Sequence, residues 1–119
     1  PYPQGKLVRC LNGKIFDVAV DIRKKSKTFG QWIGVTLDSD KHNQLWIPEG
    51  FAHGFLTLST EANVAYKTTQ YWMKDYELTI KWDDPYISID WPNINMQPIL
   101  SDKDKKSDYI NLIDSYKLL

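Results

Sequence analysis

The sequence predicts a mainly β protein, an antiparallel sandwich or barrel followed by one C-terminal helix. Short runs in which apolar and polar residues alternate recur along the chain, as expected for strands with two different faces. Turn-forming residues such as Asn-Gly and Pro-Glu-Gly separate these runs. Only the tail changes to a helical spacing of apolar residues. This order of elements is typical of an all-β domain with a terminal helix.

The first predicted strand covers residues 6–11 and ends at Asn12-Gly13. Asn-Gly between two apolar runs predicts a hairpin with the next strand, residues 15–22. Further strands are predicted over residues 31–37, 44–47, 52–58, 63–71 and 77–82, and residues 86–91 could add an edge piece. The helix begins after Ser107-Asp108, which offers an N-cap, and its apolar positions are Tyr109, Leu112, Ile113 and Tyr116.

The strand over residues 15–22 has two unlike faces. One face is wholly apolar and consists of Phe16, Val18, Val20 and Ile22. The other alternates apolar residues with the carboxylates of Asp17 and Asp21. Two interpretations stay open for these carboxylates: they face a polar interior, or they lie at the surface of a twisted edge.

Composition restricts the class of protein. The 119 residues predict a single domain over residues 1–119, and a formal net charge of zero gives no global attraction for nucleic acid or an anionic membrane. The lone Cys10 cannot form a disulfide within the chain, and its apolar flanks predict a buried, inert thiol. We find neither an apolar run of membrane-spanning length nor a signal peptide, so we expect a cytoplasmic location.

The most informative segment runs from Trp46 to Phe55. A Pro48-Glu49-Gly50 turn precedes a strand on which His53, Phe55 and Thr57 share one face. A histidine placed just after a turn can point into a cavity, and Gly54 would let another group approach closely from the other side. The other histidine, His42, lies in a polar turn and is expected to be exposed.

Several polar residues are candidates for the inward face of such a barrel. Together they could move protons next to a carbonyl group: a carboxylate fixes the tautomer of an imidazole, a phenol donates a proton, and an ammonium stabilises an enolate oxygen. The candidates are Lys6, Asp17, His53, Tyr66 and Lys67. The alternatives are that the tyrosine only packs and that the histidine is a hydrogen-bonded core residue.

Other kinds of site find no support in the sequence. The two histidines are eleven positions apart without an acidic partner at ligand spacing, so we expect no metal. Glycine-rich phosphate loops and the Gly-x-Ser-x-Gly elbow are absent, and nothing suggests a nicotinamide or flavin.

Seven segments, in this order, resemble one known family, and the longest of them, residues 44–55, is the most specific. The seven are Gln4-Gly5-Lys6-Leu7-Val8-Arg9, Val18-Ala19-Val20-Asp21-Ile22-Arg23, Thr28-Phe29-Gly30, Gln44 to Phe55, Tyr66-Lys67-Thr68-Thr69, Trp82-Asp83-Asp84-Pro85 and Pro98 to Asp104. Over almost the whole chain they resemble dTDP-4-dehydrorhamnose 3,5-epimerase. The resemblance implies a cupin-type antiparallel jelly-roll barrel.

The resemblance also implies an activity: inversion of C3 and C5 of dTDP-4-dehydro-6-deoxyglucose, which gives dTDP-4-dehydrorhamnose. The 4-keto group acidifies both neighbouring C–H bonds, so the family needs no cofactor. By their positions in the motifs, Tyr66 resembles the proton donor and Lys6 the cation beside the enolate oxygen. Asp104 resembles the carboxylate that orients the base histidine. Residues that resemble substrate contacts are His53, which Asp17 supports, together with Glu77, Lys103, Tyr71 and Trp72.

The family's base histidine lies in an Arg-Gly-Leu-His-Tyr segment before the position of Gln4. The resemblance therefore implies an N-terminally truncated, inactive portion of an epimerase that acts as a homodimer. The substrate would be a dTDP-4-keto-6-deoxy sugar on the route to a lipopolysaccharide or cell-wall polysaccharide. Two alternatives remain: a related 3- or 5-only epimerase or ketoisomerase of dTDP-4-keto sugars, and a non-catalytic sugar-nucleotide binding module.

Overall fold

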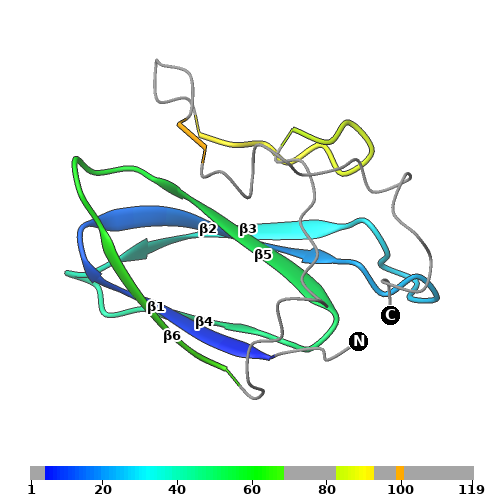
Figure 1. Cartoon of the computed structure of the whole chain (residues 1–119), viewed down its shortest axis with the longest axis horizontal. Coiled ribbons are helices and arrows are strands. Elements are labelled where there is room, and N and C mark those ends of the chain that lie inside the picture. Colours follow the sequence, from blue (N-terminus) through cyan, green and yellow to red (C-terminus); the bar gives the residue numbers. More distant parts are fainter. Residues whose placement is uncertain (1–4, 69–82, 93–98, 101–119) are drawn as a thin grey trace.

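The computed structural model describes residues 5–68, 83–92 and 99–100, and these residues contain six strands (Figure 1). The strands form two three-stranded antiparallel sheets that face each other, one in the order β4-β1-β6 and the other in the order β3-β2-β5. Their bounds are β1 Lys6–Asn12, β2 Lys14–Asp21, β3 Trp32–Asp38, β4 Gln44–Ile47, β5 Phe51–Thr57 and β6 Asn63–Thr68.

The chain crosses repeatedly between the two sheets. It changes sheet from β1 to β2, from β3 to β4, from β4 to β5 and from β5 to β6, and only β2 and β3 are consecutive strands of one sheet. The pairs β1–β6 and β2–β5 are nested in the sequence, which is how a jelly roll wraps. The predicted mainly β jelly roll is confirmed. The predicted strand over residues 77–82 and the predicted helix after Ser107-Asp108 lie outside the described residues.

The predicted hairpin at Asn12-Gly13 is wrong. β1 pairs with β4 and β6, whereas β2 pairs with β3 and β5, so this turn joins strands of opposite sheets. Gly13 has φ +86°, and a Cβ there would lie 2.2 Å from the carbonyl oxygen of Glu61. The Asn12-Gly13 turn itself is present, but a reversal of the chain does not decide which strands pair.

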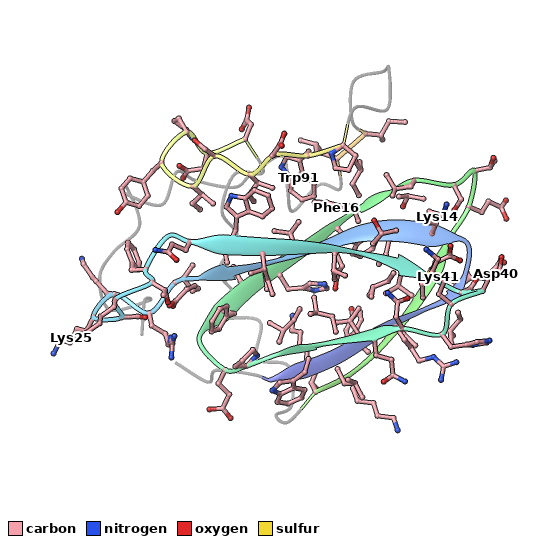
Figure 2. All side chains as sticks on the ribbon, turned by 180° about the vertical axis from the view of Figure 1, so that it is seen from behind. Lys14, Phe16, Lys25, Asp40, Lys41 and Trp91 are labelled. Carbon is pink, nitrogen blue, oxygen red and sulfur yellow. The ribbon has the colours of Figure 1, made fainter. Side chains whose placement is uncertain are left out.

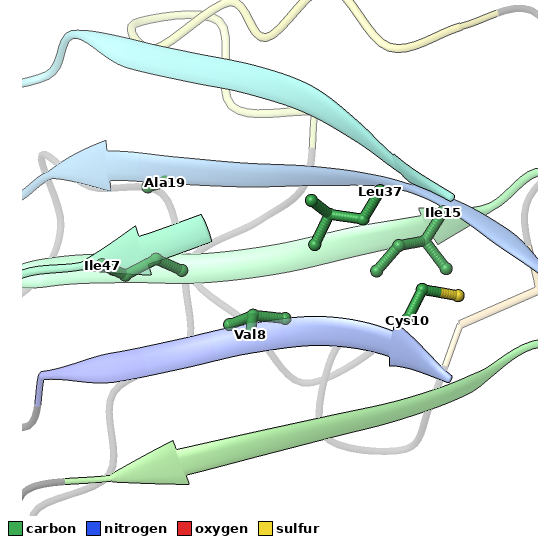
Figure 3. Packing of buried hydrophobic residues seen from close by; sticks show 6 residues of the cluster. All are labelled: Val8, Cys10, Ile15, Ala19, Leu37 and Ile47. Carbon is green, nitrogen blue, oxygen red and sulfur yellow. The ribbon is translucent and has the colours of Figure 1, made fainter. Parts of the chain in front are cut away.

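The main core lies between the two sheets (Figure 3). Val8 and Cys10 of β1 meet Ile15 and Ala19 of β2, together with Leu37 and Ile47. All six side chains are buried, which confirms that the thiol of Cys10 is buried. The same alternation places Asp17 and Asp21 on this inner face, where both are buried. The alternative that these two carboxylates lie at the surface is therefore wrong, because β2 is the central strand of its sheet.

A second apolar cluster covers the outer face of β2. Val18 and Val20 pack there with Ile87 of the segment over residues 83–92, and the rings of Phe16 and Trp91 meet edge to face at 6.1 Å (Figure 2). The predicted edge piece over residues 86–91 is wrong, because residues 86 and 87 lie in a turn and residues 88–91 are irregular. The Asp84 carboxylate accepts a hydrogen bond from the Tyr86 backbone, and the Asp84 carbonyl accepts one from the Ser88 backbone.

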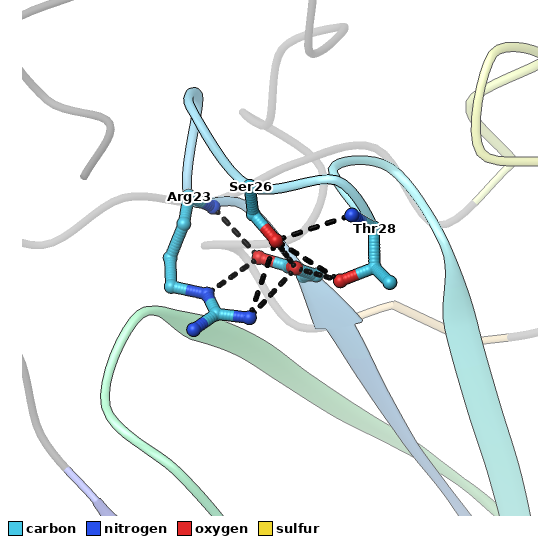
Figure 4. A network of polar contacts seen from close by, with 4 residues as sticks. Arg23, Ser26 and Thr28 are labelled. Carbon is cyan, nitrogen blue, oxygen red and sulfur yellow. Dashed lines mark hydrogen bonds and ion pairs between the residues drawn. The ribbon is translucent and has the colours of Figure 1, made fainter.

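The buried Asp21 carboxylate organises the loop after β2 (Figure 4). The backbone N–H and guanidinium of Arg23 donate to it at 2.9–3.0 Å, and the Ser26 hydroxyl donates at 2.7 Å. The Thr28 hydroxyl donates as well. These hydrogen bonds, above all those of the Arg23 side chain, hold the pKa of the Asp21 carboxyl well below its usual range, although burial acts in the opposite direction. The pKa of Arg23 is raised in turn by the carboxylate.

Candidate active site

The candidate site lies where β5 and β6 form neighbouring edges of the two sheets. These strands follow each other in the chain but belong to different sheets, so their inner faces look toward one another (Figure 1). On β5, His53 pairs with Ala19, whose side chain belongs to the inner core. Because cross-strand partners share a face, His53 points into the sandwich. The Pro48-Glu49-Gly50 turn that precedes this strand places Gly50 at φ +85°.

Asp17 of β2 holds the imidazole of His53. The distance from His53 Nε2 to Asp17 Oδ1 is 2.5 Å, and the side chains are 8% and 0% exposed. A buried carboxylate at this distance fixes the ring orientation and keeps a proton on Nε2, which leaves Nδ1 as the other functional nitrogen. Among the described residues, Asp17 Oδ2 is buried without a hydrogen-bond partner. The predicted pairing of Asp17 with His53 is therefore present.

Tyr66 of β6 faces His53 from the other sheet. It pairs with Val8, which is fully buried in the core, so its ring also lies on an inner face. The rings of Tyr66 and His53 meet edge to face, with centroids 6.4 Å apart. Tyr66 is 56% exposed, which leaves the phenol accessible to a ligand.

Lys6, the first residue of β1, is the third member of this group. It alternates with Val8 and Cys10 and pairs with Ile47, so it lies on the inner face. Its Nζ lies 5.9 Å from the centroid of the Tyr66 ring. Lys6, His53 and Tyr66 thus come from three strands and two sheets but share one end of the interior. A cation, an oriented imidazole and a phenol are the parts needed for proton transfer beside a carbonyl group.

One candidate from the sequence does not join this group. Lys67 pairs with Leu7 on the outer face of its sheet and is exposed, because neighbouring residues of a strand point to opposite sides. The candidates Glu77, Lys103, Asp104, Tyr71 and Trp72 lie outside the described residues. His42 is exposed, as predicted, in the loop between β3 and β4. A shallow surface pocket beside Phe29, Trp32 and Tyr86 contains none of the candidate residues.

Two further features concern the neighbourhood of the site. Phe55, two residues after His53, is 44% exposed on the same inner face, with its ring centroid 6.2 Å from that of the imidazole. The alternation along β5 was a signal for it, although it was not among the candidates. No described atom lies within 4 Å of the place where a Cβ on Gly54 would be, so the described residues leave open the space that Gly54 is expected to offer to another group.

Within residues 5–68, 83–92 and 99–100, no three His, Cys, Asp or Glu side chains gather closely enough to hold a metal ion. The same ranges hold no helix with the length and apolar character needed to cross a membrane.

Comparison with known proteins gives consistent matches. The family model for dTDP-4-dehydrorhamnose 3,5-epimerase matches residues 1–111. Curated proteins of that name from Shigella flexneri and Escherichia coli (strain K12) are 60% and 54% identical over 104 and 105 residues. These alignments cover 87% and 88% of the chain and 56% of each relative. The chain therefore spans about half the length of the curated relatives that it matches.

Solved structures agree with the fold. A dTDP-6-deoxy-D-glucose-3,5-epimerase from Legionella pneumophila Philadelphia 1, in complex with dTDP-4-keto-L-rhamnose, is 52% identical with a TM-score of 0.93. The match covers 97% of this chain and 61% of that chain. A 3'-monoepimerase from Streptomyces bikiniensis, in complex with dTDP-quinovose, is 31% identical with a TM-score of 0.85, over 93% of this chain and 56% of that one.

Proposed function

Because the chain belongs to the dTDP-4-dehydrorhamnose 3,5-epimerase family, we propose that it supplies the acid and the oxyanion-stabilising half of such an epimerase site. The proposed reaction inverts C3 and C5 of dTDP-4-dehydro-6-deoxyglucose. The observation that carries the proposal is the convergence of Lys6, His53 and Tyr66 from two sheets on one end of the interior. A purely structural role would not require an ammonium, an imidazole and a half-exposed phenol on the same inner face.

Each residue has a distinct proposed task. Removal of a proton from C3 or C5 places negative charge on the oxygen at C4, and the ammonium of Lys6 stabilises that oxyanion. The hydroxyl of Tyr66 then returns a proton to the opposite face of the carbon. His53, whose Nε2 lies 2.5 Å from Asp17 Oδ1, offers its Nδ1 to a hydroxyl of the sugar and so orients the sugar ring. The proton that leaves C3 or C5 passes to a base other than His53, because the family resemblance gives His53 a binding role. By that resemblance the base is the histidine of the Arg-Gly-Leu-His-Tyr segment that precedes the position of Gln4 in the family.

Deuterium incorporation tests the proposed reaction. The full gene product that contains this chain is incubated with dTDP-4-dehydro-6-deoxyglucose in deuterated buffer, and NMR follows the signals at C3 and C5. We expect deuterium at both positions and product with inverted configuration. Absence of exchange at both positions would reject the epimerase assignment, and exchange at only one position would reject double inversion.

A narrower activity is the second candidate. One relative of this chain is a 3'-monoepimerase with a TM-score of 0.85, so the same scaffold carries single inversion as well. The deuterium experiment separates the two activities, since exchange at C3 alone identifies a 3-epimerase. The stereochemistry of the product gives the same answer independently.

We further infer a cytoplasmic homodimer. In the described strands, β3 and β4 are edge strands, and exposed edges are commonly covered by another chain. Leu11 and Trp46 are also large apolar side chains that are more than half exposed on the outer side of β1 and β4. A free buried thiol at Cys10 is compatible with a reducing compartment. Light scattering of the gene product would give the oligomeric state, and a monomer at micromolar concentration would contradict the dimer.

A further inference from the structure

Phe55 places an apolar ring beside the polar site residue His53. It pairs with Asp17 across the sheet, and it therefore shares the inner face with His53. The centroids of its ring and of the imidazole are 6.2 Å apart, with an interplanar angle of 35°. The side chain is nevertheless 44% exposed. The fold thus leaves much of a phenyl ring uncovered directly next to the residues proposed to hold the sugar.

The proposed substrate has one apolar substituent that reaches this place. A 6-deoxy hexose has a methyl group on C5, and C5 is one of the two carbons whose proton is exchanged. A site that holds C5 near Tyr66 and His53 must therefore also hold the methyl group close to them. A methyl against a phenyl ring removes apolar surface from water, whereas a hydroxymethyl there would lose hydrogen bonds to water without replacement.

Other exposed apolar side chains of the described residues lie elsewhere. Leu11 and Trp46 are on the outer face of their sheet, opposite in alternation to the buried Val8 and Ile47. Ile33 faces inward but belongs to β3, the edge of the sheet remote from β5. Tyr86 and Ile99 lie beyond the six strands. Tyr66 is also exposed beside His53, but its ring carries the hydroxyl that the proposed reaction uses. Within the described part, Phe55 is thus the exposed side chain beside His53 that is apolar throughout.

We propose that Phe55 holds the C5 methyl group and makes the site selective for 6-deoxy sugars over their 6-hydroxy counterparts. This inference rests on the proposed function, because it takes the dTDP-linked sugar as the ligand. Phe55 acts here as a specificity-determining contact and takes no part in proton transfer.

Binding of two stable analogues tests the proposal. dTDP-6-deoxyglucose and dTDP-glucose differ by one hydroxyl, and neither can react, so calorimetry with the full gene product reports selectivity alone. We expect the unaltered protein to prefer the 6-deoxy compound by about 10-fold, as is usual for one small group in an apolar contact. Phe55→Ala should reduce the preference to about 2-fold or less, and Phe55→Leu should leave an intermediate value. Ile33→Ala truncates an exposed, inward-facing side chain on β3, far from Phe55. This variant should leave the preference for the 6-deoxy compound unchanged.

The outcomes separate the two proposals. An unchanged preference in Phe55→Ala, or equal binding of both analogues by the unaltered protein, overturns the role of Phe55 and leaves the epimerase assignment standing. Binding of neither analogue contradicts the epimerase assignment itself. Circular dichroism confirms the fold of each variant. If Phe55→Ala does not fold, Phe55→Leu decides, and an undiminished preference in that variant overturns the proposal.

Discussion

Replacing Asp21 by asparagine should destabilise the protein and remove part of its sensitivity to acid. The carboxylate is 1% exposed and accepts hydrogen bonds from Arg23, Ser26 and Thr28. A hydrogen bond to a charged group contributes about 1.5–3 kcal/mol, but the partners Arg23 and Thr28 are exposed and regain water when the charge is lost. We therefore expect Asp21→Asn to lower the free energy of unfolding by about 2–3 kcal/mol near neutral pH. This is far less than the summed contributions of the separate hydrogen bonds.

The pH dependence follows from the lowered pKa of Asp21. In the unfolded chain this carboxyl titrates near pH 4, whereas in the folded protein it stays ionised to lower pH. Its contribution is therefore complete above about pH 4 and is lost progressively as the pH falls below that value. Denaturant unfolding between about pH 7 and pH 2 should show the gap between the unaltered protein and Asp21→Asn narrowing in acid.

A matched control separates this effect from the general response to acid. Asp40 is an exposed aspartate in the loop after β3, so Asp40→Asn removes the same charge without touching the network. We expect this variant to follow the unaltered protein at every pH, within about 0.5 kcal/mol. If Asp21→Asn loses stability in acid in parallel with the unaltered protein, the assigned role of the carboxylate is wrong.

Three further substitutions test the site and the fold. Tyr66→Phe should reduce the epimerisation rate of the gene product by about 10²–10⁴-fold, measured by NMR of the product, whereas Tyr86→Phe, which alters an exposed tyrosine beyond the strands, should have no effect. Lys6→Met should lower kcat by at least about 10²-fold, and a change in KM alone would contradict its role at the oxyanion. Gly13→Ala should cost about 1–3 kcal/mol of unfolding free energy, because φ is +86° and the new Cβ would meet the Glu61 carbonyl. Gly54→Ala, with no described atom within 4 Å of its Cβ position, should cost less than Gly13→Ala, and equal losses in denaturant unfolding would contradict this explanation.

Much of the fold could be predicted from local patterns. Alternation and turn residues located the strands around His53 and on β2 to within one or two residues, since both signals are local. Pairing could not be predicted, and the Asn12-Gly13 turn shows why. A glycine with positive φ reverses the chain equally well within a sheet or between two sheets, and only the packing of Val8 and Cys10 against Ile15 decides between them.

The candidate site shows the same limit at the level of side chains. Alternation separated Tyr66 from Lys67, but deciding which face was internal required the buried partner Val8. The contact between Asp17 and His53 joins residues 36 positions apart, so no local pattern in the sequence predicts it. The alternation along β5 predicts that Phe55 shares a face with His53. The exposure of Phe55 depends instead on β5 and β6 being edge strands, and this cannot be predicted from one sequence.

The two histidines of this chain allow the central claim to be tested directly. His53 lies on the inner face beside Tyr66 and Asp17, whereas His42 is exposed in the loop between β3 and β4. In the gene product, NMR of the imidazole nitrogens, assigned with His53→Asn and His42→Asn, is followed while dTDP-6-deoxyglucose is added. We predict a saturable shift at His53 and none at His42. A saturable response that leaves His53 unmoved would show that the sugar nucleotide binds away from this end of the sandwich, and would contradict the proposed site.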